Sequence, residues 1–431
     1  MGTLALALVL VARPVLAAVL FLNLLPLLIW FERKGSAYIQ DRPGPNRAFI
    51  PGIGLRLGGM IHSIADVLKL AAKRELLPSH VNRRAYLLAP FLALFSALLA
   101  YAVIPFADDL RLPSGVVVPL RGLDLDLGIL WVLAAGSISV FAVVLAGWAS
   151  NNKYALMGGL RATAQMVSYE VALVLALSGA VLAYGTVDLS QAVRAQGDLL
   201  FGFVPKWGIV LQPLGFLLYA AAAFAETNRA PFDLPEGESE IVGFHVEYSG
   251  FKFAMFYMAE YLHIVTQAAV IVTLFFGGWQ VPWLPTERLL SAAPTLVPAA
   301  LAAVAAGGLL TGAACLRFHA RNRKFWADSR RREGLVLAVA LGFVPAVAAG
   351  VAFAALRGGD LPAGAGPLFT AIVQGVFFLA KVLLVSWLFI WIRWTLPRFR
   401  YDQLMTLGWR CLLPLAILNL FVTGAVVLLV G

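Results

Sequence analysis

Three ionisable side chains lie deep inside stretches that are otherwise apolar. Glu170 lies about nine residues into the apolar stretch 162–184, which is roughly 13 Å along a helix. Glu260 is similarly deep in 252–277, and Lys381 is near the centre of 368–392. An unpaired charge at the centre of a bilayer costs at least about 2.5–3.5 kcal/mol. The pattern therefore predicts an ion path, and the alternative is a structural pair, for example Lys381 with a glutamate.

Two of these residues have polar neighbours on the same helical face. His263 and Gln267 follow Glu260 by three and seven residues, so the three side chains share one side of a helix. Gln374 precedes Lys381 by seven residues and shares its face. A row of polar groups along an apolar helix is typical of a path for ions or protons.

An acidic segment joins two of the apolar stretches. Residues 226–247 contain one basic residue, Arg229, and six carboxylates, which are Glu226, Asp233, Glu236, Glu238, Glu240 and Glu247. Asp233 and Glu236 have the spacing of a capping box, which predicts a short helix. Carboxylates crowded at an apolar boundary repel one another and are poorly solvated, so their pKa values rise towards neutral pH. The segment therefore predicts proton exchange beside the bilayer.

A charged amphipathic helix is predicted at residues 60–77. Its apolar residues recur at i, i+3, i+4, i+7 and i+8 from Ile64, and its opposite side carries Asp66, Lys69 and Lys73. Such a helix is too charged to cross a bilayer and lies in its interface. It either only anchors the chain or turns its polar side towards the compartment that contains the acidic segment.

The composition indicates an integral membrane protein. Hydrophobic residues make up 61% of the 431 residues, and only 13% are charged, against about 25% in soluble domains. The apolar runs are long and unbroken, which excludes an outer-membrane barrel. The predicted fold is an all-α, polytopic transmembrane bundle with one interfacial helix. Ten stretches are long enough to span a bilayer: 4–31, 86–106, 128–148, 162–184, 207–225, 252–277, 294–316, 334–356, 368–392 and 411–430.

Lys and Arg fall mainly on one side of the predicted membrane. Of the 33 basic residues, 25 lie in one set of connections, and Arg13 and Lys381 lie inside spans. The six on the opposite side are Arg111, Arg121, Arg194, Lys206, Arg288 and Arg357. Because positive charge accumulates on the cytoplasmic side, both termini are predicted to be periplasmic. The net charge of +10 thus reflects topology and not nucleic-acid binding. A signal peptide is the alternative for the first stretch, but no basic residue precedes Arg13.

The sequence contains no motif for a complete catalytic or metal centre. Cys315 and Cys411 are the only cysteines, so the chain alone cannot hold an iron–sulfur cluster or a Cys-rich zinc site. The five histidines show no metal-ligand spacing, and no nucleophile–base pattern is present. We therefore expect no catalytic residue, metal site or bound cofactor on this chain alone.

Four strings resemble the H subunit of bacterial respiratory complex I, the family of the mitochondrial NADH dehydrogenase subunit 1. They are Glu32-Arg33-Lys34 leading into QDRPGPN at 40–46, GWASNNKYALMGGLRATAQMVSYE at 147–170, AETNRAPFDLPEGESE at 225–240 and IRWTLPRFRYDQLM at 392–405. The resemblance covers nearly the whole chain. The family has eight spans, so it implies that 294–356 is an inserted transmembrane hairpin, between a core at 1–293 and two final spans in 357–431.

The resemblance also implies roles for two groups of residues. One is a proton path through Glu170, Glu226, Glu236, Glu238, Glu240, Glu247, Glu260 and Lys381. The other faces a quinone chamber or docked subunits: Glu32, Arg33, Arg42, Arg47, Asp66, Lys69, Arg229, Asp233, Arg393, Arg398, Arg400 and Asp402. An isoprenoid tail would need an apolar slot beside the first span, the 60–77 helix and the sixth span.

The expected function is that of a membrane subunit of a proton-translocating NADH–quinone oxidoreductase in a bacterial inner membrane. Quinone would be the substrate, while FMN, iron–sulfur clusters and NADH would be bound only by partner subunits. The expected partners are the peripheral quinone-site and terminal iron–sulfur subunits, small membrane subunits, quinone and lipids, and no nucleic acid. The alternatives are the equivalent subunit of a hydrogenase-type complex and a stand-alone ion-coupled transporter.

Overall fold

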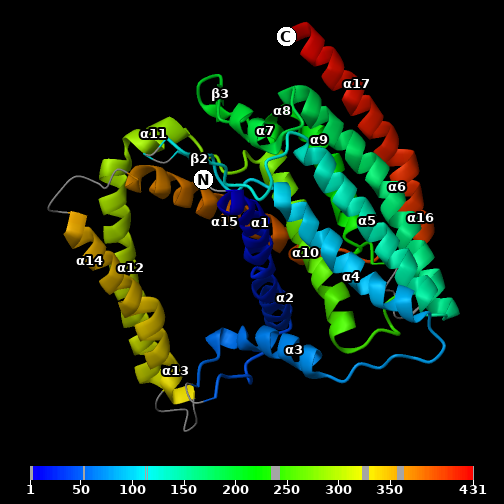
Figure 1. Ribbon diagram of the computed structural model, residues 1–431, viewed down its shortest axis with the longest axis horizontal. Coiled ribbons are helices and arrows are strands. Elements are labelled where there is room, and N and C mark those ends of the chain that lie inside the picture. Colours follow the sequence, from blue (N-terminus) through cyan, green and yellow to red (C-terminus); the bar gives the residue numbers. More distant parts are fainter. Residues whose placement is uncertain are drawn as a thin grey trace.

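The structure is a computed structural model that describes residues 3–51, 54–111, 113, 115–233, 243–322, 330–356 and 364–430. It is almost entirely helical (Figure 1). The helices are α1 (Thr3–Leu22), α2 (Leu25–Ile39), η1 (Leu57–Gly59), α3 (Ile61–Ala72), α4 (Arg83–Leu99), η2 (Ala100–Val103), α5 (Gly128–Ala149), α6 (Lys153–Tyr184), α7 (Leu189–Ala195), α8 (Gly208–Leu211), α9 (Pro213–Glu226), α10 (Gly250–Phe275), α11 (Thr286–Ser291), α12 (Ala293–Asn322), α13 (Arg330–Leu337), η3 (Ala338–Phe343), α14 (Val344–Leu356), α15 (Ala365–Thr395), α16 (Tyr401–Thr406), η4 (Leu407–Leu412) and α17 (Leu413–Val430). The strands form two short antiparallel hairpins, β1 (Leu110–Arg111) with β2 (Val117–Val118) and β3 (Leu199–Leu200) with β4 (Val204–Pro205).

The predicted polytopic helical bundle is confirmed. Within the described ranges, nine helical segments are long and apolar enough to cross a bilayer. α9 occupies the place of the remaining predicted span, but its 14 residues cover only about 21 Å. The predicted stretch 207–225 is broken because Pro213 has no N–H to continue a helix from α8. α9 packs against α6, α10 and α17 on one side, while Leu214 and Leu217 are exposed on the other.

α10 is the central helix of the bundle. Of the spanning helices it is the most buried, and it packs against α2, α3, α4, α7, α9 and α15. The neighbouring α6 is positioned by its ends: Asn152 accepts a hydrogen bond from the backbone N–H of Tyr154 at 2.9 Å, and Gly185 ends the helix with φ of 67°. Polar residues on α10 therefore face other helices and not lipid.

The interfacial helix is shorter than the sequence predicts. α3 ends at Ala72, and the chain is extended from Lys73. The reason is that the next residues are held by α10: Glu75 pairs with Lys252, and the backbone N–H of Leu76 donates to the Ser249 hydroxyl at 3.1 Å. α3 lies across the end of the bundle opposite the two termini (Figure 1). We call these ends the α3 end and the terminal end.

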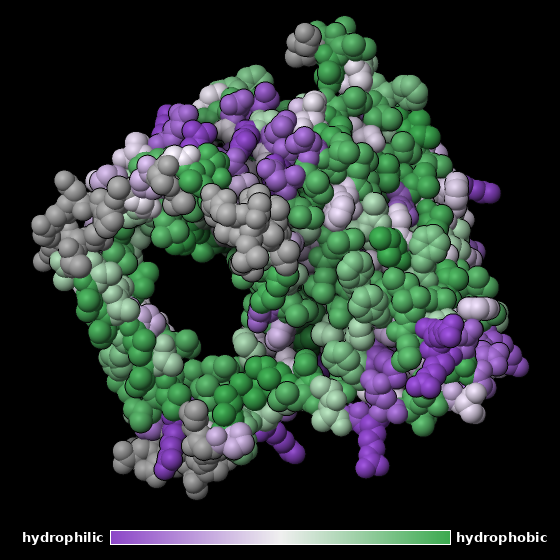
Figure 2. Space-filling model, in the orientation of Figure 1, coloured by the Kyte–Doolittle hydropathy of each residue, from purple (hydrophilic) through white to green (hydrophobic). Residues whose placement is uncertain are grey.

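The helices α12 and α14 form a hairpin that stands away from the bundle. A Cβ placed on Gly342 of η3, just before α14, would clash with the Cα of Gly312 on α12, so the chain crosses α12 where neither residue has a side chain. The hairpin meets the bundle at both of its ends: α12 contacts α15, and Glu333 accepts a hydrogen bond from the backbone N–H of Arg56 at 3.1 Å. Between these contacts an opening separates it from α1 and α2, with hydrophobic surface on both sides (Figure 2).

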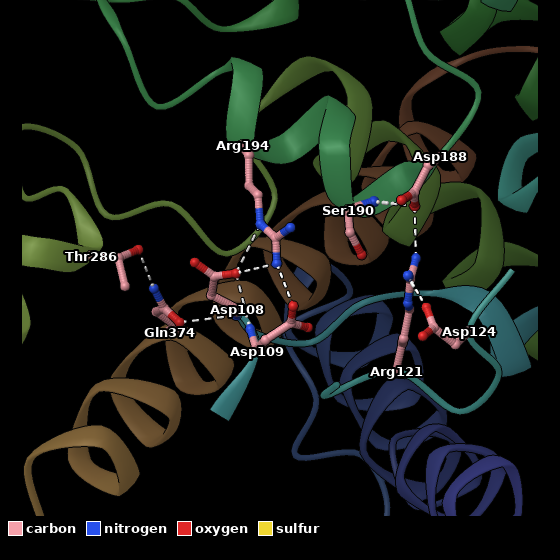
Figure 3. Close-up of polar contacts among 9 residues, drawn as sticks. All are labelled: Asp108, Asp109, Arg121, Asp124, Asp188, Ser190, Arg194, Thr286 and Gln374. Carbon is pink, nitrogen blue, oxygen red and sulfur yellow. Dashed lines mark hydrogen bonds and ion pairs between the residues drawn. The ribbon is translucent and has the colours of Figure 1, made fainter. Parts of the chain in front are cut away.

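Ion pairs tie the connections at the terminal end together (Figure 3). Arg194 on α7 lies 2.7 Å from both Asp108 and Asp109. Arg121 pairs with Asp124 and lies 2.7 Å from Asp188, the residue that caps α7. Two of the six basic residues predicted on this side therefore each face two aspartates.

Candidate functional site

A buried ion cluster lies where α2, α10 and the start of the acidic segment meet. Guanidinium nitrogens of Arg229 lie 3.7 Å from a carboxylate oxygen of Glu32 and 3.4 Å from one of Glu260. The guanidinium is also 4.4 Å from the ring centroid of Tyr261. The three charged side chains are only 11–20% exposed. A cation between two buried carboxylates offsets part of their desolvation cost, so Arg229 joins the acid of α2 to the acid of α10.

Glu32 receives two further hydrogen bonds. The Tyr261 hydroxyl donates to Oε2 at 2.5 Å, and the Arg393 guanidinium donates to Oε1. Arg393 belongs to the last turn of α15. The cluster thus links α2, α10 and α15, and it brings together Glu32, Arg229, Glu260 and Arg393, which the sequence assigned to two different groups.

The other deep acids line a small cavity inside the bundle. Glu170 on α6, Glu226 at the end of α9 and His263 on α10 all line it. The Ser137 hydroxyl of α5 donates to Glu170. The cavity has a volume of about 20 Å³, which is room for about one water molecule. Two carboxylates facing so small a space are costly to bury with both charged.

Gln267 orients one of these acids. Its Nε2 donates to Glu226 Oε2 at 2.7 Å, and its Oε1 accepts a hydrogen bond from the Tyr219 hydroxyl at 2.5 Å. A Cβ placed on Gly136 would lie 3.3 Å from Glu226 Oε1, so the glycine of α5 leaves space for this carboxylate. The single face of α10 predicted from the sequence therefore reaches two places: Glu260 lies in the ion cluster, and Gln267 lies at the cavity.

Glu247 is held by different partners. Its Oε1 accepts a hydrogen bond from Asn152 Nδ2 at 2.7 Å, and its backbone carbonyl accepts one from the Tyr86 hydroxyl at 2.6 Å. The Tyr86 ring stacks on Tyr248 with 4.1 Å between centroids. These contacts fix the end of the acidic segment against α4 and α6. Glu236, Glu238, Glu240 and the expected capping box lie outside the described residues.

The polar side of α3 forms a rim beside the ion cluster. Asp66 pairs with Arg33 of α2, and the Lys69 ammonium lies 3.4 Å from the same carboxyl group. Burial alone would raise the pKa of Asp66, but the hydrogen bond and charge of Arg33 outweigh it and lower that pKa below its usual value. Asp66 is therefore held in its charged form.

The segment after α15 contributes two more ion pairs. Arg398 lies 2.8 Å from Asp233, and burial raises the pKa of Asp233 even though the charge of Arg398 opposes the shift. Arg400 lies 3.0 Å from Asp402, and both side chains are largely exposed. An exposed pair of this kind contributes little to stability, and both groups remain accessible at the surface.

Two predicted arginines are exposed on the connection between α2 and α3. Arg42 and Arg47 both face outward. The backbone N–H groups of Arg47 and Ala48 donate to Nε2 of His62, each at 2.9 Å. The connection is therefore anchored on the start of α3, with its arginine side chains directed away from the bundle.

Lys381 has no carboxylate partner among the described residues, so these residues give no support to the alternative of a structural pair with a glutamate. Its ammonium donates to the backbone carbonyls of Phe276, Gly278 and Gln280 at 2.8–2.9 Å. It also lies 4.9 Å from the ring centroid of Trp207. These carbonyls follow the end of α10, where helical hydrogen bonding has stopped, so Lys381 satisfies acceptors that would otherwise be buried without a donor.

Several residues that complete the site were not predicted. Ser137, Tyr219 and Tyr261 are hydroxyl donors to the site's acids or to Gln267. Tyr261 follows Glu260 directly, and Ser137 is polar in an apolar stretch. Such residues are common in helices, so only the packing identifies their partners.

Comparison with known proteins gives one consistent result. The NADH dehydrogenase family matches residues 12–424. The chain is 42% identical to the H 1 subunit of the NADH-quinone oxidoreductase of Solibacter usitatus over 416 residues, covering 95% of each chain. It is 36% identical to the H subunit of the Bdellovibrio bacteriovorus enzyme over 422 residues, covering 93% of this chain and 91% of the other. It is 39% identical to NADH-quinone oxidoreductase subunit 8 of Rhodothermus marinus, covering 91% and 89%. The chain therefore belongs to the NADH dehydrogenase family, together with these subunits of NADH-quinone oxidoreductases.

Proposed function

We propose that this chain is the membrane subunit of a proton-translocating NADH–quinone oxidoreductase, that it forms the portal and part of the wall of the quinone chamber, and that its buried acids carry protons away from that chamber. The observation that supports this most strongly is the arrangement along α10. Glu260 lies in the ion cluster, while His263 and Gln267 lie at the cavity with Glu170 and Glu226.

The quinone chamber would lie at the α3 end. α3 packs against both α2 and α10, which brings the polar rim of Arg33 and Asp66 to the same end as the ion cluster. Charge-assisted hydrogen bonds from such groups can orient a quinone headgroup or a docked subunit. The apolar faces of α1, α2 and α10 would accept the isoprenoid tail. Lys69, Arg42, Arg47, Arg398 and Arg400 would face docked peripheral subunits.

The proton path would begin beside this chamber. Reduction of a quinone to a quinol consumes protons as well as electrons. We expect the electrons to come from an iron–sulfur cluster of a partner subunit, with NADH and FMN bound by other partners. The change of charge would pass from the ion cluster to Glu226 and Glu170, because coupled buried carboxylates respond to one another's charge. Glu247 and the acids at 236–240 would supply protons, and Lys381 would lie further along the path.

The orientation follows from the charge distribution. The α3 end would face the cytoplasm, where docked subunits reduce quinone, and the terminal end would face the periplasm. The basic residues concentrated in the connections at the α3 end support this orientation.

The experiment is to replace one acid of the cavity without changing its shape. In the intact complex, Glu226→Gln should slow NADH oxidation by quinone at least tenfold, an effect of about 1.4 kcal/mol, and leave NADH oxidation by an artificial acceptor unchanged. The control is Glu287→Gln, which makes the same change on exposed α11. Normal quinone turnover in the Glu226 variant would contradict the assignment.

The two alternatives predict different assemblies. A stand-alone transporter would purify alone in mild detergent, whereas the proposed subunit would bring flavin, iron and many chains with it. A hydrogenase-type complex would bring iron without an NADH-oxidising flavin subunit.

A further inference from the structure

An apolar groove lies between α1 and α15 at the terminal end. It has a volume of about 350 Å³, and its walls include Leu16 and Leu20 of α1 and Gly375 and Leu379 of α15. It follows each helix for about two turns, or roughly 10 Å. The α1 side is open to the surroundings of the bundle, since Leu16 is 66% exposed. The groove is therefore an open apolar site, closed on its other sides by Phe106, Ala107 and the connection 118–122.

One cation lines this groove without a partner among the described residues. Arg13 lies ten residues after the start of α1, and the residues before it are apolar as well. Its level is set by the connection that lines the same groove, from Val118 to Gly122, at the terminal end of the bundle. Its Nε is buried and has no hydrogen-bond acceptor in the described part of the chain. A guanidinium in apolar surroundings is unfavourable unless an anion pairs with it. We therefore expect an anion to pair with Arg13 at this end of the apolar groove.

A second arginine at the groove does not need this anion. Arg121 also lines the groove, but Asp124 and Asp188 neutralise it on the side away from Arg13's helix (Figure 3). The contrast between the two arginines distinguishes a structural ion pair from a cation that is free to bind a ligand.

We propose that this groove binds a glycerophospholipid, with its phosphate on Arg13 and one acyl chain lying between α1 and α15. The phosphate of a bilayer lipid lies at the end of the hydrocarbon region, which is also the level at which connections such as 118–122 join the spanning helices. Guanidinium is well suited to phosphate because its N–H groups can donate two parallel hydrogen bonds. Apart from Arg121, the remaining lining residues, such as Leu16, Leu20 and Phe106, offer apolar contact to the acyl chain. The proposal depends on the membrane location of the chain and not on its role in quinone chemistry.

Gly375→Leu provides a way to close the groove without disturbing the fold. Nothing lies within 4 Å of a Cβ placed on Gly375, so a larger side chain enters open space. Gly350 on α14 is equally open and does not line the groove. Gly350→Leu is therefore the matched control. For the charge, Arg13→Gln is matched by Arg111→Gln, an exposed arginine at the same end that does not line the groove.

The experiment uses the intact complex, purified in mild detergent and incubated with phosphatidylglycerol that carries a photoactivatable group on its acyl chain. Labelled peptides are then mapped by mass spectrometry. Labelling of the α1 and α15 segments should fall at least tenfold in both Arg13→Gln and Gly375→Leu, and it should be unchanged in both controls. A photoactivatable diacylglycerol, which lacks the phosphate, should label these segments at the reduced level.

Three results would overturn the proposal. The first is equal labelling in wild type and in Gly375→Leu. The second is equal labelling by diacylglycerol and phosphatidylglycerol, which would remove the role of Arg13. The third is a cross-link from the groove to another protein chain in the native membrane, which would make the groove a subunit contact. If Arg13→Gln fails to assemble, the Gly375 variant and the diacylglycerol probe still decide the question.

Discussion

The ion cluster allows a quantitative test of the charge on Arg229. At the observed separations of 3.7 and 3.4 Å, each attraction amounts to about 4–5 kcal/mol at an effective dielectric constant of about 20. Desolvation of three buried charges offsets most of this. Removing this cation by Arg229→Gln takes its charge from two buried carboxylates, of which Glu32 still pairs with Arg393; loss of one partner of a buried ion pair costs about 3–5 kcal/mol. The double variant Arg229→Gln with Glu260→Gln removes one of those charges and should recover about 1–3 kcal/mol.

The assay is the rate of thermal inactivation of the membrane-bound complex, since an assembly of many chains has no single unfolding equilibrium. The single variant should inactivate at least about tenfold faster than wild type, a factor that corresponds to about 1.4 kcal/mol, and the double variant should be slower than the single. The control is Arg400→Gln, because that arginine is 75% exposed in its pair and should contribute little. The reasoning fails if Arg229→Gln inactivates no faster than Arg400→Gln, or if the two substitutions in the double variant are additive.

Three further predictions concern other parts of the chain. Lys381→Met should destabilise the complex by about 2–4 kcal/mol and speed its thermal inactivation, since it removes three charge-assisted hydrogen bonds. Unchanged thermal inactivation with reduced proton pumping would instead support a role in the proton path. Gly342→Leu should separate α12 from η3 at a cost of at least about 1–3 kcal/mol and lower the yield of assembled complex, whereas Gly350→Leu should not. Burial raises the pKa of Asp233, so the folded protein holds more protons than the unfolded chain between about pH 3.9 and the raised pKa. Stability therefore falls as pH rises through that window. In thermal inactivation measured across the window, Asp233→Asn should remove this pH dependence, and Asp402→Asn should leave it unchanged.

Spans and deep acids could be predicted because each is a local property of the sequence. An unbroken apolar stretch has no other stable location than a bilayer or a core. A glutamate inside it, such as Glu170, stands out from its own neighbours alone. The spacing of Glu260 and Gln267 also correctly placed both on one side of α10. Pro213 is present in the sequence as a residue that can break a helix. A span of about 20 apolar residues was nevertheless expected there, because hydrophobicity over such a length does not show that α9 is shorter.

Contacts between distant segments could not be predicted in this way. Glu32 and Arg393 are 361 residues apart, and nothing in either local sequence specifies the other. Lys381 shows the consequence. Its depth in a span suggested a carboxylate as one possible partner, because opposite charges attract most strongly away from water. The structure instead uses backbone carbonyls at the end of α10, and a carbonyl carries no signature in an amino-acid sequence.

At the terminal end, the number of basic residues overestimates the net positive charge, because some of them pair with carboxylates. Six basic residues were predicted on that side, but Arg121 and Arg194 each face two aspartates, so neither adds net positive charge there. By the same reasoning Arg13 becomes exceptional. It belongs to neither set of connections, it lies inside the first predicted span, and no carboxylate of the described residues pairs with it. Because Arg121 and Arg194 are neutralised by aspartates at this end, Arg13 without a carboxylate has no evident role in holding the bundle together. A bilayer phosphate is the nearest anion at its depth.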